Sequence, residues 1–348
     1  MPEKPTDRAG LRLAWVREIL HDPVITLTPA SSDASFRSYW RTVGRMPALV
    51  VMDAPPPRED IRPWIAIGRQ LAAAGLHVPT VHASDAERGF ALIEDFGNRL
   101  YLDALDEASA DTLYAEALDA LLRMQTRMPT GDLAPYDADF LRGELAQLQP
   151  WFLERHLGYP PDPAQRQTLE QAFEVLVDNA LQQPQCFVHR DFHSRNLMLV
   201  ETQRPGVIDF QGALHGPITY DLVSLLRDCY IAWDEHRVDA WRERHRSHLI
   251  RAGLLDAGID ATRFRRWFDL TGLQRHLKVL GIFCRLAQRD GKPGYLADLP
   301  RVFDYVVRVA SRYPELAELA ALLRDATEGH ALSRAFTAPD PAPTPCAP

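Results

Sequence analysis

The sequence predicts an α+β protein with a small β-rich N-terminal part and a larger helical C-terminal part. Between residues 24 and 93, short apolar runs, some of which alternate with period two, surround a single segment with a helical period. Beyond residue 98 the chain reads mainly as helices, interrupted by a few short apolar segments. Several strands grouped with one helix, followed by many helices, are typical of an α+β architecture.

In the N-terminal part, an amphipathic helix is expected over residues 11–22, and a second helix over 60–74 ends at Gly75. The small, polar segment Pro29–Ser35 predicts a loop between strands. The expected strands are 24–27, 36–43, 48–52, 80–83 and 90–93.

In the C-terminal part, three short apolar segments, Cys186–Val188, Leu197–Val200 and Gly206–Ile208, interrupt the helices. The Pro- and Ala-rich tail from residue 335 has no apolar period and is expected to be disordered. The expected helices are 109–126, 138–156, 164–182, 219–232, 237–252, 262–289 and 299–311.

Composition describes an ordinary globular protein of 348 residues, 46% hydrophobic and 25% charged, long enough for two domains or one two-lobed domain. A net charge of −8 argues against a nucleic-acid or membrane-surface partner, and no obligate protein partner is evident. The four cysteines are widely spaced, which favours a reducing compartment. Without a signal-peptide pattern or a long apolar run, we expect a cytoplasmic protein.

Charge is unevenly distributed along the chain. Residues 240–301 contain 13 Lys and Arg against 6 Asp and Glu, a balance of +7 that leaves −15 for the rest. Only three lysines occur in the sequence, Lys4, Lys278 and Lys292. Any site that needs a lysine elsewhere in the chain must therefore use another residue.

The strongest functional signal is the segment from Phe187 to Asn196, which is followed by the apolar run before Asp209. Asp191 follows a short strand, where its carboxylate can orient or accept the proton of a hydroxyl group. Asn196 and Asp209 offer oxygen ligands to a magnesium ion, which needs few protein ligands when it binds phosphates. Phosphoryl transfer requires such an oriented nucleophile and neutralised phosphate oxygens, so the spacing predicts a kinase.

Neighbouring residues of this segment have less distinctive patterns. His189 is interpreted as a packed, hydrogen-bonded residue that orients the loop. His193 is a loop contact, because no second His or Cys lies at metal-binding spacing.

The motifs from His189 to Asn196, around Asp209 and from Gly216 to Leu222 resemble the signature of the aminoglycoside phosphotransferase and choline kinase family. The resemblance spans about residues 25–310 and implies a bilobal protein-kinase-like fold that uses ATP and Mg²⁺. It implies that Asp191 is the catalytic base, that Asn196 and Asp209 are metal ligands, and that Asp221 steadies the catalytic loop. The expected parts are a nucleotide-binding lobe over 1–97, a catalytic and substrate lobe over 98–330, and a tail over 331–348.

The sequence departs from kinases of this fold at one important pair. The strand-three lysine position falls on Met52, and the helix over 61–74 has no acidic residue to take the place of its usual glutamate partner. Two interpretations follow, a nucleotide-binding protein without turnover or an active enzyme that holds the phosphates differently. The intact set of Asp191, Asn196 and Asp209 favours activity.

Other residues are candidates for nucleotide binding. The loop serines could form a phosphate nest, and Arg37 or Arg41 could supply positive charge, although a plain polar loop and a solvated strand face are the alternatives. In the family, the backbone after the fifth strand hydrogen-bonds adenine, which here implies a role for Glu94 and Phe96 mainly through their main-chain groups. A plain linker turn that ends at Gly97 is the alternative. The nucleotide-binding candidates are Ser31, Ser32, Ser35, Phe36, Arg37, Glu94 and Phe96.

The basic region suggests an acceptor that is not a cation. Gln274, Lys278 and Arg285 fall near one face of a predicted helix, with Gly281 leaving room between them. This face could bind a carboxylate or the hydroxyl and amide groups of a sugar, and Arg195 is a further candidate. A solvated basic stripe is the alternative.

At finer grain, the segments Ser32–Arg37, Val51–Pro56, Gln274–Lys278 and Asp290–Tyr295 resemble bacterial anomeric kinases of N-acetylmuramate and N-acetylglucosamine. This resemblance implies phosphorylation of the C1 hydroxyl in cell-wall sugar recycling. Two alternatives stay open, a kinase of another small alcohol such as choline, homoserine or an aminoglycoside, and a non-catalytic nucleotide-binding module.

Overall fold

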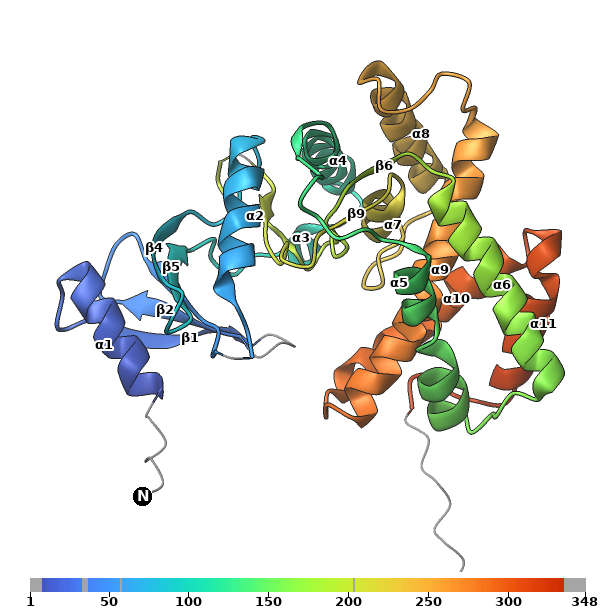
Figure 1. Ribbon diagram of the computed structural model, residues 1–348, viewed down its shortest axis with the longest axis horizontal. Helices are drawn as coiled ribbons and strands as arrows, with labels where there is room; N and C mark the ends of the chain where they lie inside the picture. The colour runs from blue at the N-terminus through green and yellow to red at the C-terminus, as the bar shows by residue number, and fades with distance from the viewer. Residues whose placement is uncertain (1–7, 33–36, 57, 203, 335–348) are drawn as a thin grey trace, which may run out of the picture. The chain divides into compact units, whose positions relative to one another are not determined.

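The computed structural model describes residues 8–32, 37–56, 58–202 and 204–334 (Figure 1). The chain divides into two compact units, Met1–Asp132 with His189–Ala213, and Leu133–Val188 with Leu214–Pro348. The expected disordered tail from residue 335, together with Ser35 and Phe36 and the side chains of Ser31 and Ser32, lies outside the described residues.

An antiparallel five-stranded sheet is the centre of the first unit, and its strands follow the order β1-β2-β3-β5-β4. Every residue of β3 is buried, as its continuous apolar sequence predicts. The strands are β1 (Thr26–Ser32), β2 (Ser38–Val43), β3 (Leu49–Asp53), β4 (Val81–Asp85) and β5 (Phe90–Glu94).

Helix α1 (Arg8–Leu20) packs on one face of this sheet, where Trp15 and Val16 share a buried cluster with Val51. Arg12 fixes the helix through an ion pair of 2.6 Å with buried Asp53 and also lies 3.8 Å above the ring of Trp40. A buried ion pair of this kind specifies one placement of the helix more than it stabilises the fold.

Helix α2 (Ile61–Ala73) lies on the other side of the sheet from α1 (Figure 1). Asp60 caps its first turn by accepting a hydrogen bond from the backbone N–H of Arg62, as Asp commonly does at this position. The first unit also contains α3 (Tyr101–Ala104), α4 (Ala110–Arg127), and the short strands β7 (Leu197–Met198) and β8 (Gly206–Val207).

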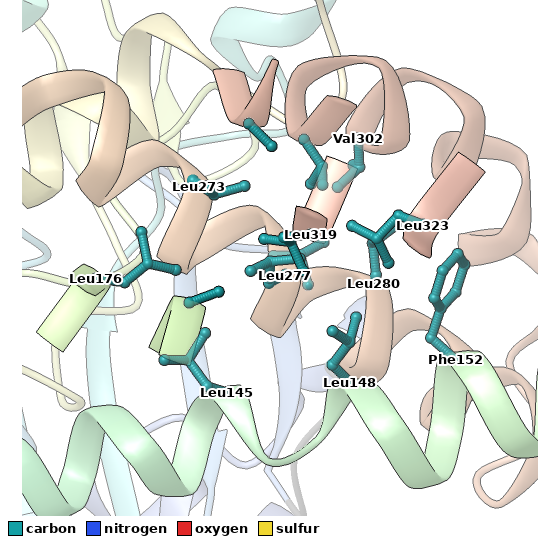
Figure 2. Packing of buried hydrophobic residues seen from close by; sticks show 14 of the residues in the cluster. Leu145, Leu148, Phe152, Leu176, Leu273, Leu277, Leu280, Val302, Leu319 and Leu323 are labelled. Atoms are coloured by element: carbon teal, nitrogen blue, oxygen red, sulfur yellow. The ribbon is translucent and has the colours of Figure 1, made fainter. Parts of the chain in front are cut away.

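The second unit is mainly helical and is built around α9 (Ala261–Gln288), which is buried along most of its length. Figure 2 shows Leu273, Leu277 and Leu280 of this helix among apolar side chains from neighbouring helices. The other elements are α5 (Ala138–Leu145), η1 (Leu148–His156), α6 (Pro163–Leu181), β6 (Gln185–Val188), β9 (Leu214–Pro217), α7 (Tyr220–Leu226), α8 (Glu235–Arg251), η2 (Pro293–Asp298), α10 (Leu299–Ala310), η3 (Pro314–Leu316) and α11 (Ala317–Thr327).

Three sequence predictions about these elements are wrong for identifiable reasons. Strand β1 runs through Pro29–Ser32, where a loop was expected, because an edge strand with a bulge tolerates proline. The helix expected over 138–156 divides into α5 and the π-helix η1, since Pro150 has no N–H to continue the α-helical bonding. Helix α7 ends at Leu226 rather than near 232, and the next carbonyl, of Arg227, accepts a hydrogen bond from His276 instead.

In the part of the chain that the structure describes, every helix is too short or too polar to span a bilayer.

Two glycines of α9 allow a matched test of this packing. A β-carbon at Gly281 would lie 2.5 Å from the backbone of Gln147, whereas one at Gly272 would lie 3.5 Å from Val223. We expect Gly281→Ala to lower the free energy of unfolding by about 1–3 kcal/mol through overpacking. Gly272→Ala should leave it unchanged or raise it by up to about 1 kcal/mol, because alanine favours a helix. Urea unfolding of both variants measures the difference, and equal effects would contradict this packing.

Candidate active site

The segment 189–213 is held to the rest of the first unit by backbone hydrogen bonds. The N–H of Val207 donates to the carbonyl of His77 at 2.7 Å, and the N–H of Leu199 donates to the carbonyl of Arg99 at 2.8 Å. Within the segment, β7 and β8 pair as a short antiparallel ladder. These bonds fix the backbone positions from which Asp191, Asn196 and Asp209 project.

The side chain of Asn196 connects the other two predicted functional residues. Its Nδ2 donates to the carbonyl oxygen of Asp191 at 2.9 Å and reaches Oδ2 of Asp209 at 3.4 Å. The carbonyl of Asn196 also accepts from the N–H of Ile208 at 3.1 Å. The structure therefore brings the three residues together in one loop assembly, although thirteen positions separate Asn196 from Asp209.

Asp209 has a backbone conformation that side chains rarely adopt, with φ of 64°, and Arg190 has φ of 77°. Such left-handed geometry at non-glycine residues is concentrated at functional sites, where the surroundings enforce it. Gln211 contributes by donating from Nε2 to Oδ1 of Asp209 at 2.6 Å. Our sequence analysis missed Gln211, and its position two residues after Asp209 was the only available signal.

The amide of Asn196 and the carboxylate of Asp209 fit a magnesium ion. Magnesium binds oxygen and is usually held by one or two carboxylates together with phosphate oxygens and water. Among the residues placed by the structure, no cluster of three or more His, Cys, Asp or Glu could hold a metal ion. The donor set suits an ion whose remaining ligands arrive with a polyphosphate.

His189 is a buried link within the loop. One ring nitrogen, Nε2, lies 3.1 Å from the carbonyl oxygen of Ile208, and the other, Nδ1, accepts from the N–H of Asp191 at 3.3 Å. This pairing requires the neutral ring with its proton on Nε2. Burial lowers the pKa of His189 to about 4, which agrees with a neutral orienting residue.

Helix α2 contacts the segment that holds Asp209 through apolar side chains. The ring of Trp64 stacks on Phe210 with centroids 5.1 Å apart, and a β-carbon at Gly68 would lie 3.2 Å from the same ring. Met52, at the expected lysine position, is completely buried in β3. An apolar contact thus connects α2 to the residue after Asp209.

The segment after β5, where a nucleotide base was expected, is anchored by side chains. Oε2 of Glu94 accepts from the hydroxyl of Thr80 at 2.9 Å, and Oε1 lies 3.1 Å from Nε2 of His77. The ring of Phe96 packs edge-on against His77 at 4.6 Å. It also covers Gly206, where a β-carbon would lie only 2.9 Å from that ring. The side chains of Glu94 and Phe96 therefore make contacts within the first unit, and a main-chain role toward adenine stays a prediction.

Arg41 braces the same segment from β2. Its guanidinium donates to both carboxylate oxygens of Asp95, at 2.5 and 2.9 Å, and to Oδ1 of Asn98 at 2.8 Å. Burial by itself would raise the pKa of Asp95, but hydrogen bonds from Arg41 and from the N–H of Gly97 lower it below its usual value. Arg41 is thus occupied at the end of β5.

Arg37, a nucleotide-binding candidate, directly precedes β2. Its guanidinium pairs with Glu59, with Nη2 3.1 Å from Oε2. Burial opposes the charge, but Tyr39 and Glu59 together raise the pKa of Arg37 above its usual value.

The remaining candidates occupy different surroundings. Arg195 is exposed in the first unit, and Asp221 is buried in the first turn of α7 in the second unit. On α9, Nζ of Lys278 lies 2.7 Å from Oε1 of Glu144, and Gln274 donates to the other oxygen of this carboxylate at 3.2 Å.

Arg285 donates to Oε1 of Gln147 at 3.1 Å, so the row from Gln274 to Arg285 contacts the segment from Glu144 to Gln147. The alternative of a solvated basic stripe is wrong, because Gln274 and Lys278 are buried. Gly281 leaves room for the backbone of Gln147, not for a ligand.

A five-stranded antiparallel sheet joined to a loop that presents an Asp, an Asn and a second Asp defines the class of kinase-like phosphotransferases. The chain belongs to the phosphotransferase enzyme family that also includes aminoglycoside and choline kinases, and the family signature matches residues 26–265. This confirms the resemblance and the α+β, protein-kinase-like fold predicted from the sequence.

Curated relatives are similar over nearly the whole chain. The N-acetylmuramate/N-acetylglucosamine kinase of Pseudomonas putida is 45% identical over 94% of this chain and 99% of its own length. The protein of the same name from Pseudomonas aeruginosa is 48% identical over 88% of this chain and 90% of its own length.

Solved structures with the same fold are much more distant in sequence. ADP-bound aminoglycoside phosphotransferase APH(2'')-Ib has a TM-score of 0.56 at 15% identity, covering 84% of this chain and 96% of its own. Choline kinase LicA from Streptococcus pneumoniae has a TM-score of 0.59 at 12% identity, covering 86% and 99%. At these identities the likeness establishes the fold.

The link made by His189 can be tested through the pH dependence of stability. Replacing His189 by Ala removes the partners of Ile208 and Asp191 and should lower the free energy of unfolding at pH 7–8 by about 1–3 kcal/mol. Because folding depresses the pKa of His189, the wild type should lose stability as pH falls from about 6.5 to about 4. The gap between wild type and variant should therefore narrow in that window, by at most about 1.4 kcal/mol per pH unit.

Urea titrations at several pH values measure this gap, with His236→Ala as the control, because His236 is exposed. A gap that stays constant from pH 7 to pH 4 would show that His189 is not held neutral.

Proposed function

We propose that this protein transfers the γ-phosphoryl group of ATP to the anomeric C1 hydroxyl of N-acetylmuramate, N-acetylglucosamine or both, and so takes part in cell-wall sugar recycling. The observation that carries the proposal is the 45–48% identity, over at least 88% of the chain, to curated relatives named as kinases of these two sugars. The loop assembly of Asp191, Asn196 and Asp209 supplies the groups that such a reaction needs. Use of ATP agrees with the cytoplasmic location expected from the sequence.

In the proposed mechanism, Asp191 orients the C1 hydroxyl and accepts its proton as the oxygen forms a bond to the γ-phosphorus. The bond between this phosphorus and the β–γ bridging oxygen breaks, and ADP leaves. An anomeric hydroxyl is more acidic than an ordinary alcohol, so a carboxylate of ordinary basicity can take the proton late. Asn196 and Asp209 would hold Mg²⁺, which neutralises charge on the phosphate oxygens.

His189 and Gln211 are proposed to keep these groups in place. The Nδ1 atom of His189 holds the backbone N–H of Asp191, and Gln211 donates to the carboxylate of Asp209. Asp209 is thereby restrained in its left-handed conformation, with Gln211 on Oδ1 and the Asn196 amide at 3.4 Å from Oδ2. Pre-arranged groups of this kind avoid reorganisation during the reaction, which is the main source of catalysis in phosphoryl transfer.

For the sugar itself we propose contacts from α9. Oε1 of Gln274 and Nε of Arg285 are buried and have no hydrogen-bond partner among the residues that the structure places. Eleven positions separate the two along the helix, which is about 16 Å at 1.5 Å per residue. A single monosaccharide would therefore contact one end of this row, and Lys278 would share its charge with Glu144.

The assignment is tested by measuring ADP release with N-acetylmuramate, N-acetylglucosamine and choline as acceptors. Turnover is expected with one or both sugars, and the product should have lost its reducing end, because a C1 phosphate blocks it. A product that still reduces would place the phosphate elsewhere on the sugar. Turnover with choline alone would favour the second kinase class, and ATP binding without any turnover would favour a non-catalytic module.

The roles of the carboxylates are tested by Asp191→Asn and Asp209→Asn. Both should lower kcat by at least about 1,000-fold, since each removes a group that acts on the transferred phosphoryl or its acceptor. Only Asp209→Asn should also weaken the dependence of nucleotide binding on magnesium. Asp139→Asn is the control, because this carboxylate is fully exposed on α5. Wild-type turnover in either test variant would remove the assignment.

A further inference from the structure

The missing strand-three lysine leaves an open question in the nucleotide site. Met52 at that position is completely buried. Of the three lysines in the sequence, Lys4 alone is outside the second unit. Lys4 lies outside the described residues, and Lys278 and Lys292 belong to the second unit. Among the described residues of the first unit there is no lysine, so a permanently charged side chain for the phosphates there would be an arginine.

Strand register identifies which arginines share the face of Met52. In the antiparallel pair of β2 and β3, Tyr39 is opposite Met52, so these two side chains lie on the same face. Because side chains alternate along a strand, Arg37 and Arg41 lie on the face of Tyr39. The opposite face, with Leu49 and Val51, is the one that packs against α1.

Of these two arginines, Arg41 is already used as a brace. Its guanidinium makes a two-pronged contact with Asp95 and a further bond to Asn98, at the end of β5. It therefore supports the segment expected to hold the base, away from the β3 end marked by the Ser38–Asp53 pair.

Arg37 lies at the other end of the same face. It is two residues before Tyr39, the partner of Met52, and directly precedes the Ser38–Asp53 pair. Its side chain is 8% exposed. Its partner Glu59, 19% exposed, directly precedes Asp60, which caps α2. Arg37 and Glu59 thus join the start of β2 to the start of α2.

Helix α2 continues this connection to the segment that holds Asp209. Trp64 stacks on Phe210, the neighbour of Asp209 in the chain. A lysine–glutamate pair in other kinases connects strand three to the corresponding helix, whose position controls activity. Here an ion pair connects the start of β2 to the start of α2, and an aromatic contact connects α2 to the residue after Asp209.

We propose that Arg37 takes over the task of the missing lysine by binding the phosphates of the nucleotide that are not transferred, and that Glu59 positions it. The ligand class is a nucleoside di- or triphosphate. A guanidinium has five N–H donors in a planar fork, enough to serve a carboxylate and a phosphate together, and it stays charged when buried. Phe210 and Trp64 then give α2 the contact that sets Asp209 relative to this arginine.

Binding of ADP and of adenosine, each measured by calorimetry with magnesium and without any acceptor, tests the proposal. Arg37→Ala should weaken ADP binding by at least tenfold and leave adenosine binding within twofold of wild type, because only the phosphates lose a partner. Arg37→Gln keeps the size and a hydrogen bond to Glu59, so it tests the same loss of charge with less risk to folding. Equal affinities for ADP in wild type and Arg37→Gln would overturn the proposal, as would equal losses for ADP and adenosine.

The positioning role of Glu59 is tested by a double-mutant cycle on ADP affinity. Glu59→Gln should change ADP binding by at least threefold in the wild type and by less than 1.5-fold in Arg37→Gln, because it acts through Arg37. The same effect in both backgrounds would overturn this role. The matched control is Arg62→Ala, which should leave ADP binding unchanged. It removes an ion pair with Asp60, and the side chain of Arg62 is 76% exposed.

The inference rests on the proposed function only for its use of a nucleotide. Since no sugar is present in these binding experiments, a wrong acceptor would not affect them. A wild-type protein that binds no ADP would instead overturn the proposed function itself.

Discussion

The geometry of the loop from His189 to Ala213 depends on two side chains that each bridge two backbone or carboxylate groups. His189 joins Ile208 to Asp191, and Asn196 joins Asp191 to Asp209. Both bridges cross between the two ends of the loop, so neither end can shift without breaking one of these partly buried hydrogen bonds. A buried polar group left without its partner is costly, which makes the arrangement all-or-none. The left-handed backbone at Arg190 and Asp209 is tolerated because these bonds enforce it.

The first unit replaces one familiar electrostatic contact by several others. Where kinases of this fold place a lysine on strand three, β3 is apolar throughout its inner face, and α2 reaches the loop through Trp64 and Phe210. Charged side chains lie toward the two ends of β2, where Arg37 pairs with Glu59 and Arg41 pairs with Asp95. Arginine suits both positions because its fork holds a carboxylate in a defined orientation and stays charged when partly buried.

In the second unit, part of the positive charge of residues 240–301 is balanced by carboxylates outside that range. Lys278 and Gln274 share the carboxylate of Glu144, Arg265 pairs with Asp239, and Arg266 pairs with Glu315. Glu144 lies outside the basic region, so the local charge count overstated how much positive charge is available to a ligand. Helix α9 does offer Oε1 of Gln274 and Nε of Arg285, two buried atoms that have no hydrogen-bond partner among the described residues.

The order and type of most elements could be read from the sequence, because apolar periodicity and capping residues act locally, as at Asp60 and Gly75. The loop with Asp191, Asn196 and Asp209 could also be predicted, since a reaction that needs one base and two oxygen ligands constrains residue type and spacing. The partners of charged side chains could not be predicted from the sequence. Arg37 and Glu59, like Lys278 and Glu144, are far apart in the chain and meet only through tertiary packing. The sequence by itself thus determined the fold class and the family, and it predicted the loop that the structure assembles around Asp191, Asn196 and Asp209. Only the tertiary structure decided which charges neutralise each other, because ion pairing depends on distance in space and not on order along the chain.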